Sequence, residues 1–197
     1  TKYKFDESNS LLAQVLGSNT EYPDDIHQYL LANKPEQLLR TQHQGDFSDQ
    51  AIKIDFKHDS EFWRVTANHQ QIGKDFRGDL GFMPKADFKQ NKVLVDRLFY
   101  SDNESFWQEA KLSGQWQIQH NEKGELLERS LATSFNIDGP KLSYFDLMFS
   151  HADKVGLRHD RSSLAIDGNT TRFTENQLTF STNAQPSPRL YAAFDIT

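Results

Sequence analysis

The chain has 197 residues, of which 36% are hydrophobic and 12% aromatic, and it carries a net charge of −6. Charges of both signs are spread along it, which argues against a nucleic-acid-binding surface, so we expect no nucleic acid among its partners. The absence of cysteine excludes disulfides, thiolate metal sites and cysteine nucleophiles.

The first predicted elements are a strand at residues 11–16 and a helical insert near residues 23–40. Pro23 followed by the acidic Asp24 is typical of a helix start, and apolar residues then recur from Ile26 at helical spacing. We expect this insert to pack on one face or one end of a sheet.

Strict alternation of apolar and polar residues dominates the rest of the chain. Residues 52–56 and 63–67 predict a hairpin, and residues 106–120 form the longest alternating run. Gly124 follows in a turn that favours positive φ. About ten strands joined in order predict a single all-β domain over residues 1–197, an antiparallel up-and-down meander that forms a curved sheet or a barrel.

Two kinds of barrel share this alternation. An outer-membrane barrel turns its apolar face outward to lipid, whereas a soluble barrel turns it inward. Aromatic residues near strand ends favour the membrane form, but Arg129 and Arg172 fall on nominally apolar faces, where an arginine at mid-bilayer would cost about 2–4 kcal/mol. Periodicity alone leaves both forms open, because it defines two faces and not which one meets water.

One segment resembles a known family. Trp63, the Asp75-Phe76 pair and Gly-Phe-Met-Pro-Lys at residues 81–85 are similar to a pattern in uncharacterised bacterial envelope proteins. Those proteins carry an N-terminal domain like the family-nine carbohydrate-binding modules and a barrel-like C-terminal region. The resemblance implies that this chain is part of that C-terminal region, a portion of a larger protein, in the outer membrane or periplasm of a Gram-negative bacterium.

The same segment predicts a structural loop. We expect Phe76 and Phe82 to be largely buried against the sheet, Gly78 or Gly81 to have positive φ, and Pro84 to help fix the bend. A buried Phe82 predicts a loss of about 3–5 kcal/mol in Phe82→Ala.

Ligand-binding candidates lie on the polar face of the longest strand. Trp107 could stack on a sugar ring beside Glu109 and Gln115. The carboxylates and the seven histidines match no known metal or catalytic motif. We therefore name no catalytic residue, no metal ligand and no cofactor.

Three functions follow from these patterns, in decreasing order of support. The first is a segment of an outer-membrane β-barrel, linked to carbohydrate binding or uptake and in contact with membrane lipid. The second is a soluble β-barrel or sandwich that binds a saccharide or an apolar ligand. The third is a hydrolase that uses Glu109 and Asp146. No recognisable motif positions this pair of carboxylates, so the sequence favours a protein that is not an enzyme.

Overall fold

The computed structural model describes residues 1–22, 24–33, 45–77, 86–102, 106–155, 172–187 and 190–197. These form one helix and ten strands: β1 (Lys2–Lys4), β2 (Asn9–Tyr22), α1 (Asp24–Asn33), β3 (Gly45–Asp59), β4 (Trp63–Ile72), β5 (Phe88–Tyr100), β6 (Glu109–His120), β7 (Leu126–Asp138), β8 (Tyr144–Val155), β9 (Arg172–Ser187) and β10 (Leu190–Ile196).

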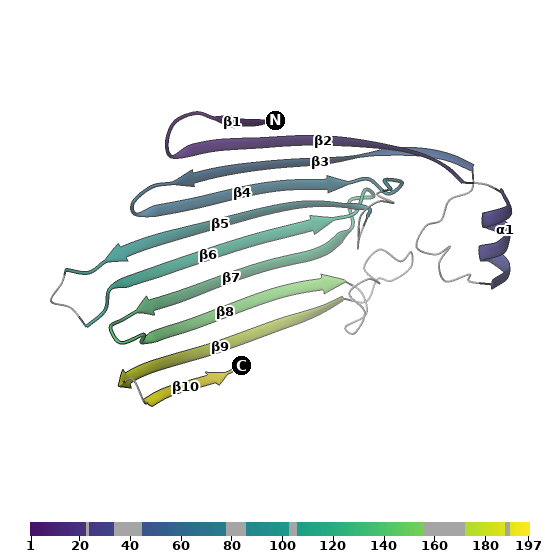
Figure 1. The fold of residues 1–197 in the computed structure, drawn as a ribbon. Coiled ribbons are helices and arrows are strands. Elements are labelled where there is room, and N and C mark those ends of the chain that lie inside the picture. The colour runs from purple at the N-terminus through teal and green to yellow at the C-terminus, as the bar shows by residue number, and fades with distance from the viewer. Residues whose placement is uncertain (23, 34–44, 78–85, 103–105, 156–171, 188–189) are drawn as a thin grey trace.

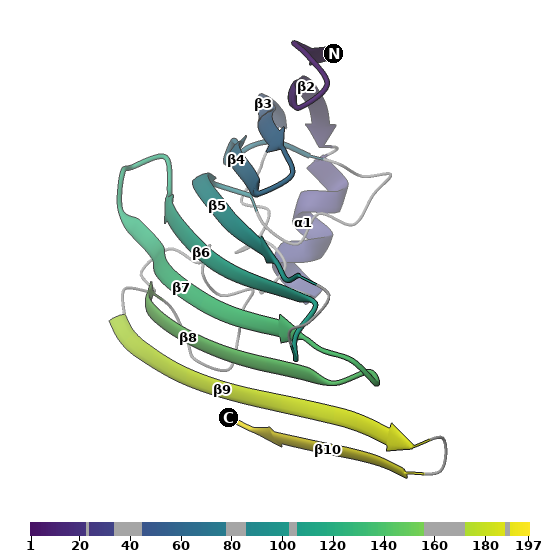
Figure 2. The same cartoon turned by 90° about the vertical axis from the view of Figure 1, so that its left-hand side faces the viewer.

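The ten strands make a single antiparallel sheet in which spatial order follows chain order from β1 to β10 (Figure 1). This confirms the predicted up-and-down meander. Of the two predicted forms, the structure has the open sheet: β1 and β10 lie at opposite edges, and the described strands do not close into a barrel (Figure 2). The sheet is gently bowed, as expected from the twist of neighbouring strands.

The two ends of the sheet differ in how strands are joined. At one end, on the left in Figure 1, residues 5–8, 60–62, 101–108, 139–143 and 188–189 connect the strands; this is the hairpin end. The opposite end carries the connections at 23–44, 73–87, 121–125 and 156–171 and is called the long-connection end. Three of these four are longer than any connection at the hairpin end.

Turn residues explain two of the connections. Gly124 has φ 81°, as its place in the β6–β7 turn predicted. In the β1–β2 turn, the Asp6 carboxylate accepts hydrogen bonds from the backbone of Ser8 at 2.8 Å and of Asn9 at 2.7 Å. Bonds from the Asn9 side chain and the Ser8 backbone lower the pKa of Asp6 below its ordinary value.

Helix α1 begins at Asp24, where Pro23 and the acidic pair predicted a start. It lies beyond the long-connection end, past β2 and β3, and covers neither face of the sheet (Figure 1). The described part of the insert therefore lies beyond one end of the sheet, but α1, contrary to the prediction, is not packed against any described strand. The predicted second helical turn near residues 36–40 lies outside the described residues.

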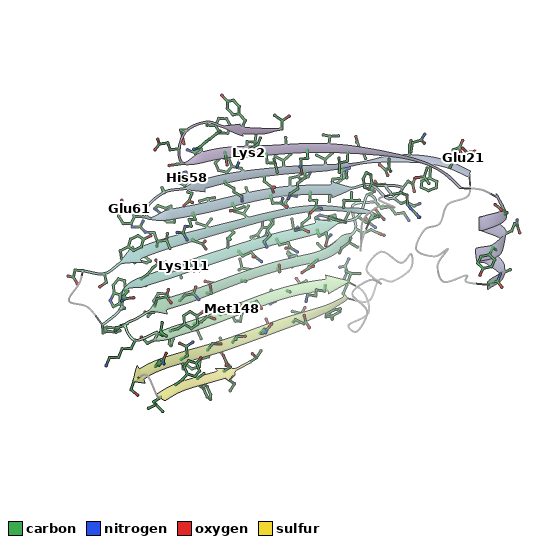
Figure 3. All side chains as sticks on the ribbon, viewed as in Figure 1. Lys2, Glu21, His58, Glu61, Lys111 and Met148 are labelled. Carbon is green, nitrogen blue, oxygen red and sulfur yellow. The ribbon has the colours of Figure 1, made fainter. Side chains whose placement is uncertain are left out.

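The sheet is a single layer, so its core is small. Side chains stand on both sides of it without a second described layer over either (Figure 3). Leu98 is the one large side chain in the described part of the chain that is fully buried, and Phe88 is 6% exposed. The residues of this sheet therefore bury far less apolar surface than those of a two-layer domain.

Candidate functional site

One face of the sheet carries large apolar side chains that no other described element covers. Residues directly opposite each other in antiparallel strands share a face, and the register places Leu147, Phe135 and Leu112 side by side. Their exposed fractions are 39%, 36% and 47%. The exposed apolar residues of this face, called the apolar face, are Val15, Ile54, Trp63, Phe99, Leu112, Trp116, Leu131, Phe135, Leu147, Phe149, Leu178, Phe194 and Ile196.

The opposite face is polar and less exposed. Gln70, Gln90 and Gln119 lie directly opposite one another on β4, β5 and β6, and Gln119 is only 3% exposed. Farther along the sheet, Lys154 Nζ lies 2.6 Å from Glu175 Oε2. A buried glutamine beside exposed leucines is the reverse of the usual arrangement in a water-soluble sheet.

The contiguous apolar part of the apolar face, called the apolar band, crosses the strands obliquely. In β8 it consists of alternate residues 145–149 and is centred on Leu147. In β3 it consists of alternate residues 52–56 and is centred on Ile54. The band therefore has a well-defined centre on each of these two strands. The pairing register shows how far one centre is displaced along the strand direction relative to the other.

The two band centres can be compared on β4. Following the register partners of Leu147 across β7, β6 and β5 leads to Trp63 on β4. Ile54, the band centre on β3, lies opposite His69, which is six residues farther along β4. The band centre thus moves about 20 Å along the strands while it crosses about 24 Å of sheet, at ~3.3 Å per residue and ~4.8 Å per strand. These lengths correspond to a tilt of about 40°. Strands of barrels are tilted by about 35–45° relative to the barrel axis.

Polar residues border the apolar band on its long-connection side. Arg129 Nη2 donates to Asp153 Oδ2 at 2.6 Å, and Thr174 Oγ1 donates to Asp153 Oδ1 at 2.8 Å. His151 Nδ1 lies 2.7 Å from Asn176 Oδ1 in the same border. Arg129 is therefore on the apolar face, as the alternation predicted, but it stands at the edge of the band with a carboxylate partner. Arg172 begins β9 and lies at the same end of the sheet.

Exposed aromatic rings gather at the hairpin end. The rings toward this end are Tyr3, Phe5, Phe62, Trp63, Phe99, Tyr100, Phe106, Tyr191 and Phe194. The other exposed rings in the described part of the chain are Trp116, Phe135 and Phe149 on the apolar face and Tyr29 on α1. Among the described side chains, the strand ends at the long-connection end carry no exposed aromatic ring. Each hairpin turn from β1–β2 to β5–β6, and the one before β10, is flanked by at least one of these rings.

Arg97 lies on the apolar face within this aromatic group. Its guanidinium carbon is 5.0 Å from the ring centroids of Phe62 and Trp63 and 5.2 Å from that of Phe99. Its Nη1 donates to the Phe62 carbonyl at 3.3 Å. We call these four residues the Arg97 cluster. The sequence alone does not predict this cluster, because its members come from a turn and two strands whose register the alternation does not specify.

The structure places the predicted ligand-binding residues on or beside the polar face without bringing all of them together. Trp107 and Glu109 adjoin at the hairpin end, where Glu109 lies opposite Asp138. Gln115 lies six residues farther along β6, a distance of about 20 Å. One small ligand could therefore reach Trp107 and Glu109 but not Gln115. Asp146, the other carboxylate considered for hydrolysis, instead accepts a hydrogen bond from Asn136.

The predicted structural loop falls partly within the described residues. Phe76 is half-buried rather than largely buried. Gly78, Gly81, Phe82 and Pro84 lie outside the described residues, so their predicted roles stay predictions. The described start of the loop is held by hydrogen bonds: the backbone of Asp75 donates to Asp49 Oδ2 at 2.9 Å, and that of Arg77 donates to Ser18 Oγ at 3.0 Å.

Gly73, at the start of this loop, provides a testable contact. It is buried, and a Cβ added there would overlap the Asp49 carboxylate. Gly73→Ala should displace that carboxylate, break its bond to Asp75, and lower the free energy of unfolding by about 1–3 kcal/mol. The matched control is Gly114→Ala, because nothing lies within 4 Å of an added Cβ there. Urea unfolding measures the loss of stability, and amide hydrogen exchange at Asp75, which should be faster in Gly73→Ala, reports the broken bond. Equal stability of the two variants would contradict the prediction.

Comparisons of the chain with protein-family models, with curated proteins and with solved structures find no match. Within the described residues, no group of three or more acidic, histidine or cysteine side chains is placed to hold a metal ion. The described helix is too short to span a membrane.

Proposed function

We propose that this chain forms part of the wall of a β-barrel in the outer membrane of a bacterial envelope, with its apolar face toward lipid and its polar face toward the lumen. The oblique apolar band is the observation that carries the proposal. In a barrel the strands are tilted, so a lipid-facing belt parallel to the membrane must cross them obliquely. The angle of about 40° derived from the register lies in the range of tilts for such barrels.

Three further features support this assignment. The aromatic rings at the hairpin end match the position of an interfacial girdle. Short turns at one end and longer connections at the other match the usual asymmetry of outer-membrane barrels. The resemblance of residues 72–85 to bacterial envelope proteins favours the same location.

A barrel wall also requires paired edges, because unpaired backbone groups in hydrocarbon cost several kcal/mol each. β1 pairs with only Ser10–Leu12 of the longer β2, and β10 pairs with β9 no farther than Phe180. In this proposal further strands complete the ring at both edges.

The glutamine- and serine-rich polar face suits a lumen for polar solutes. A saccharide is the solute we propose, stacked on Trp107 beside Glu109, since the flat face of an indole fits the C–H surface of a sugar ring. Titrating oligosaccharides while following Trp107 fluorescence, in a variant that lacks Trp63 and Trp116, tests this part separately. Unchanged Trp107 fluorescence across a broad panel of oligosaccharides would contradict the proposal that a saccharide binds there.

The membrane assignment is tested by the depth of single tryptophans in lipid. Two variants, each retaining only Trp116 or only Trp107, are refolded into vesicles of lipids brominated at different depths. We expect deep bromines to quench Trp116, which lies within the apolar band, and to leave Trp107 unaffected. Equal quenching of both residues, or failure of the protein to enter vesicles, would contradict the proposal.

A water-soluble binding module is the second candidate, and one observation favours it. In β3 and β8 the apolar band has three outward-facing positions, about 16 Å of strand, which is less than the ~25 Å band of typical outer-membrane barrels. An apolar ligand or a second sheet would then cover the face. Under this alternative the protein would be a compact soluble species without lipid or detergent.

A further inference from the structure

Two arginines of the apolar face have opposite electrostatic surroundings. Arg129 is paired with the Asp153 carboxylate at the long-connection border. Arg97, at the hairpin end, has no carboxylate within ion-pair distance among the described residues, and its neighbours are three aromatic rings and the Phe62 carbonyl. A permanently charged guanidinium on an apolar face requires either water or an anion.

The position of the Arg97 guanidinium indicates where that anion would come from. Phe62 belongs to the β3–β4 turn, so a guanidinium 5.0 Å from its ring lies toward the end of the sheet rather than in the middle of the apolar band. An arginine that extends along apolar surface to place its charge at the membrane boundary is a common arrangement at lipid interfaces. The boundary of a bilayer is the layer of lipid phosphates.

Most donors of this guanidinium remain available to such a group. Arginine has five N–H donors, and the hydrogen bond that Arg97 donates to the Phe62 carbonyl, 3.3 Å from Nη1, uses one of them. Phe62, Trp63 and Phe99 lie around the guanidinium with their ring centroids 5.0–5.2 Å from its carbon. Two parallel N–H donors of an arginine match two phosphate oxygens. The aromatic rings also fix the orientation of the guanidinium before the anion arrives, which reduces the entropic cost of binding.

We propose that the Arg97 cluster binds the phosphate of a lipid headgroup at the hairpin-end boundary of the membrane. The proposal rests on the membrane assignment and deepens it, since it names the lipid group that contacts this face. Arg97 supplies charge and paired donors, and the three rings hold the guanidinium and contact the glycerol and upper acyl region. The same guanidinium chemistry would bind any phosphate group. The experiment therefore has to distinguish a lipid headgroup from free inorganic phosphate as the bound anion.

The test compares two detergents with the same dodecyl tail, one with a phosphocholine headgroup and one with an uncharged maltoside headgroup. Binding is followed through Trp63, which contacts the guanidinium, in a variant whose other two tryptophans are phenylalanine. Arg97→Gln should weaken the apparent affinity for the phosphocholine detergent about tenfold relative to the maltoside, the loss expected for a charge-assisted hydrogen bond.

Arg64→Gln is the matched control. Arg64 is the next residue along β4 from Trp63, at the same end of the sheet, but it points to the opposite face and its Nε lies 3.4 Å from Asp59 Oδ1. It should leave both affinities unchanged. Equal weakening of both detergents by Arg97→Gln, or the same selective loss in Arg64→Gln, would overturn the headgroup site.

Inorganic phosphate separates the two sources of the anion. We expect it to change Trp63 fluorescence little at concentrations where the phosphocholine detergent saturates, because the headgroup is held by its tail as well as by its phosphate. Tight binding of inorganic phosphate alone would overturn the lipid assignment. If Trp116 enters the bilayer while the Arg97 variant behaves as wild type, the membrane assignment stands and only this inference fails.

Discussion

Replacing Leu147 by arginine should destabilise the protein in vesicles by about 2–4 kcal/mol if its apolar face meets lipid as proposed, because this is the cost of an arginine on a lipid face near the middle of a bilayer. Leu147 is the centre of the apolar band on β8, and its register neighbours Phe135 and Phe180 offer no counter-charge. The free energy of unfolding in vesicles, measured by urea titration of tryptophan emission, checks the value.

Met148→Arg is the control for this substitution. Met148 is the next residue along β8, at nearly the same depth, but it lies on the polar face between Ser134 and Thr179 (labelled in Figure 3). Met148 is half-buried, and under the proposal its face meets the aqueous lumen, into which a long arginine side chain can extend its charge. Met148→Arg should therefore cost less than about 1 kcal/mol, well below the cost of Leu147→Arg. If Met148→Arg proved the more damaging of the two, the assignment of the two faces would have to be reversed.

Leu98→Ala should lower the free energy of unfolding by about 2–5 kcal/mol, the range for a leucine truncated in a packed site. Leu98 is fully buried, and its backbone N–H donates to the Phe62 carbonyl at 2.9 Å. The truncated side chain would leave a cavity at this buried position. Chemical denaturation measured under the same conditions for wild type and variant gives this quantity.

Leu112→Ala removes the same atoms from the neighbouring strand, where the side chain is 47% exposed on the opposite face. In detergent or lipid its loss should be less than half that of Leu98→Ala, because apolar solvent fills the space. Similar losses of unfolding free energy in Leu112→Ala and Leu98→Ala would mean that Leu112 is covered by protein in the folded state. A soluble β-sandwich would bury it in that way.

Much of the fold could be predicted from the sequence, since alternation of side chains is a local property of each strand. The strand around residues 106–120, the helix start at Asp24 and the positive φ of Gly124 all follow from neighbours in the chain. The open form of the sheet could not be predicted, because closure depends on whether the first and last strands meet.

The candidate site was less predictable, because it depends on register. Alternation assigns Leu147 and Ile54 to an apolar side of their strands, but the tilt of the band appears only when the offsets between five pairs of strands are known. The contacts of Arg97 with Phe62 and Phe99 likewise join separate parts of the chain. The offset of Gln115 from Glu109 was visible in the sequence, since residues six apart on one strand are well separated.

The strict neighbour-to-neighbour order of the sheet has a consequence for how it assembles. Each strand pairs only with the strands before and after it in the chain. Pairing can therefore start at any hairpin and spread from strand to strand, as it does in repeat proteins. An error of one residue at any junction would turn every later strand over and move its apolar side chains to the other face. The described pairings shift register in two places, between Gln119 and His120 and between Leu190 and Ala192. Deleting or inserting a residue at such a bulge should therefore be tolerated better than the same change in the middle of β8.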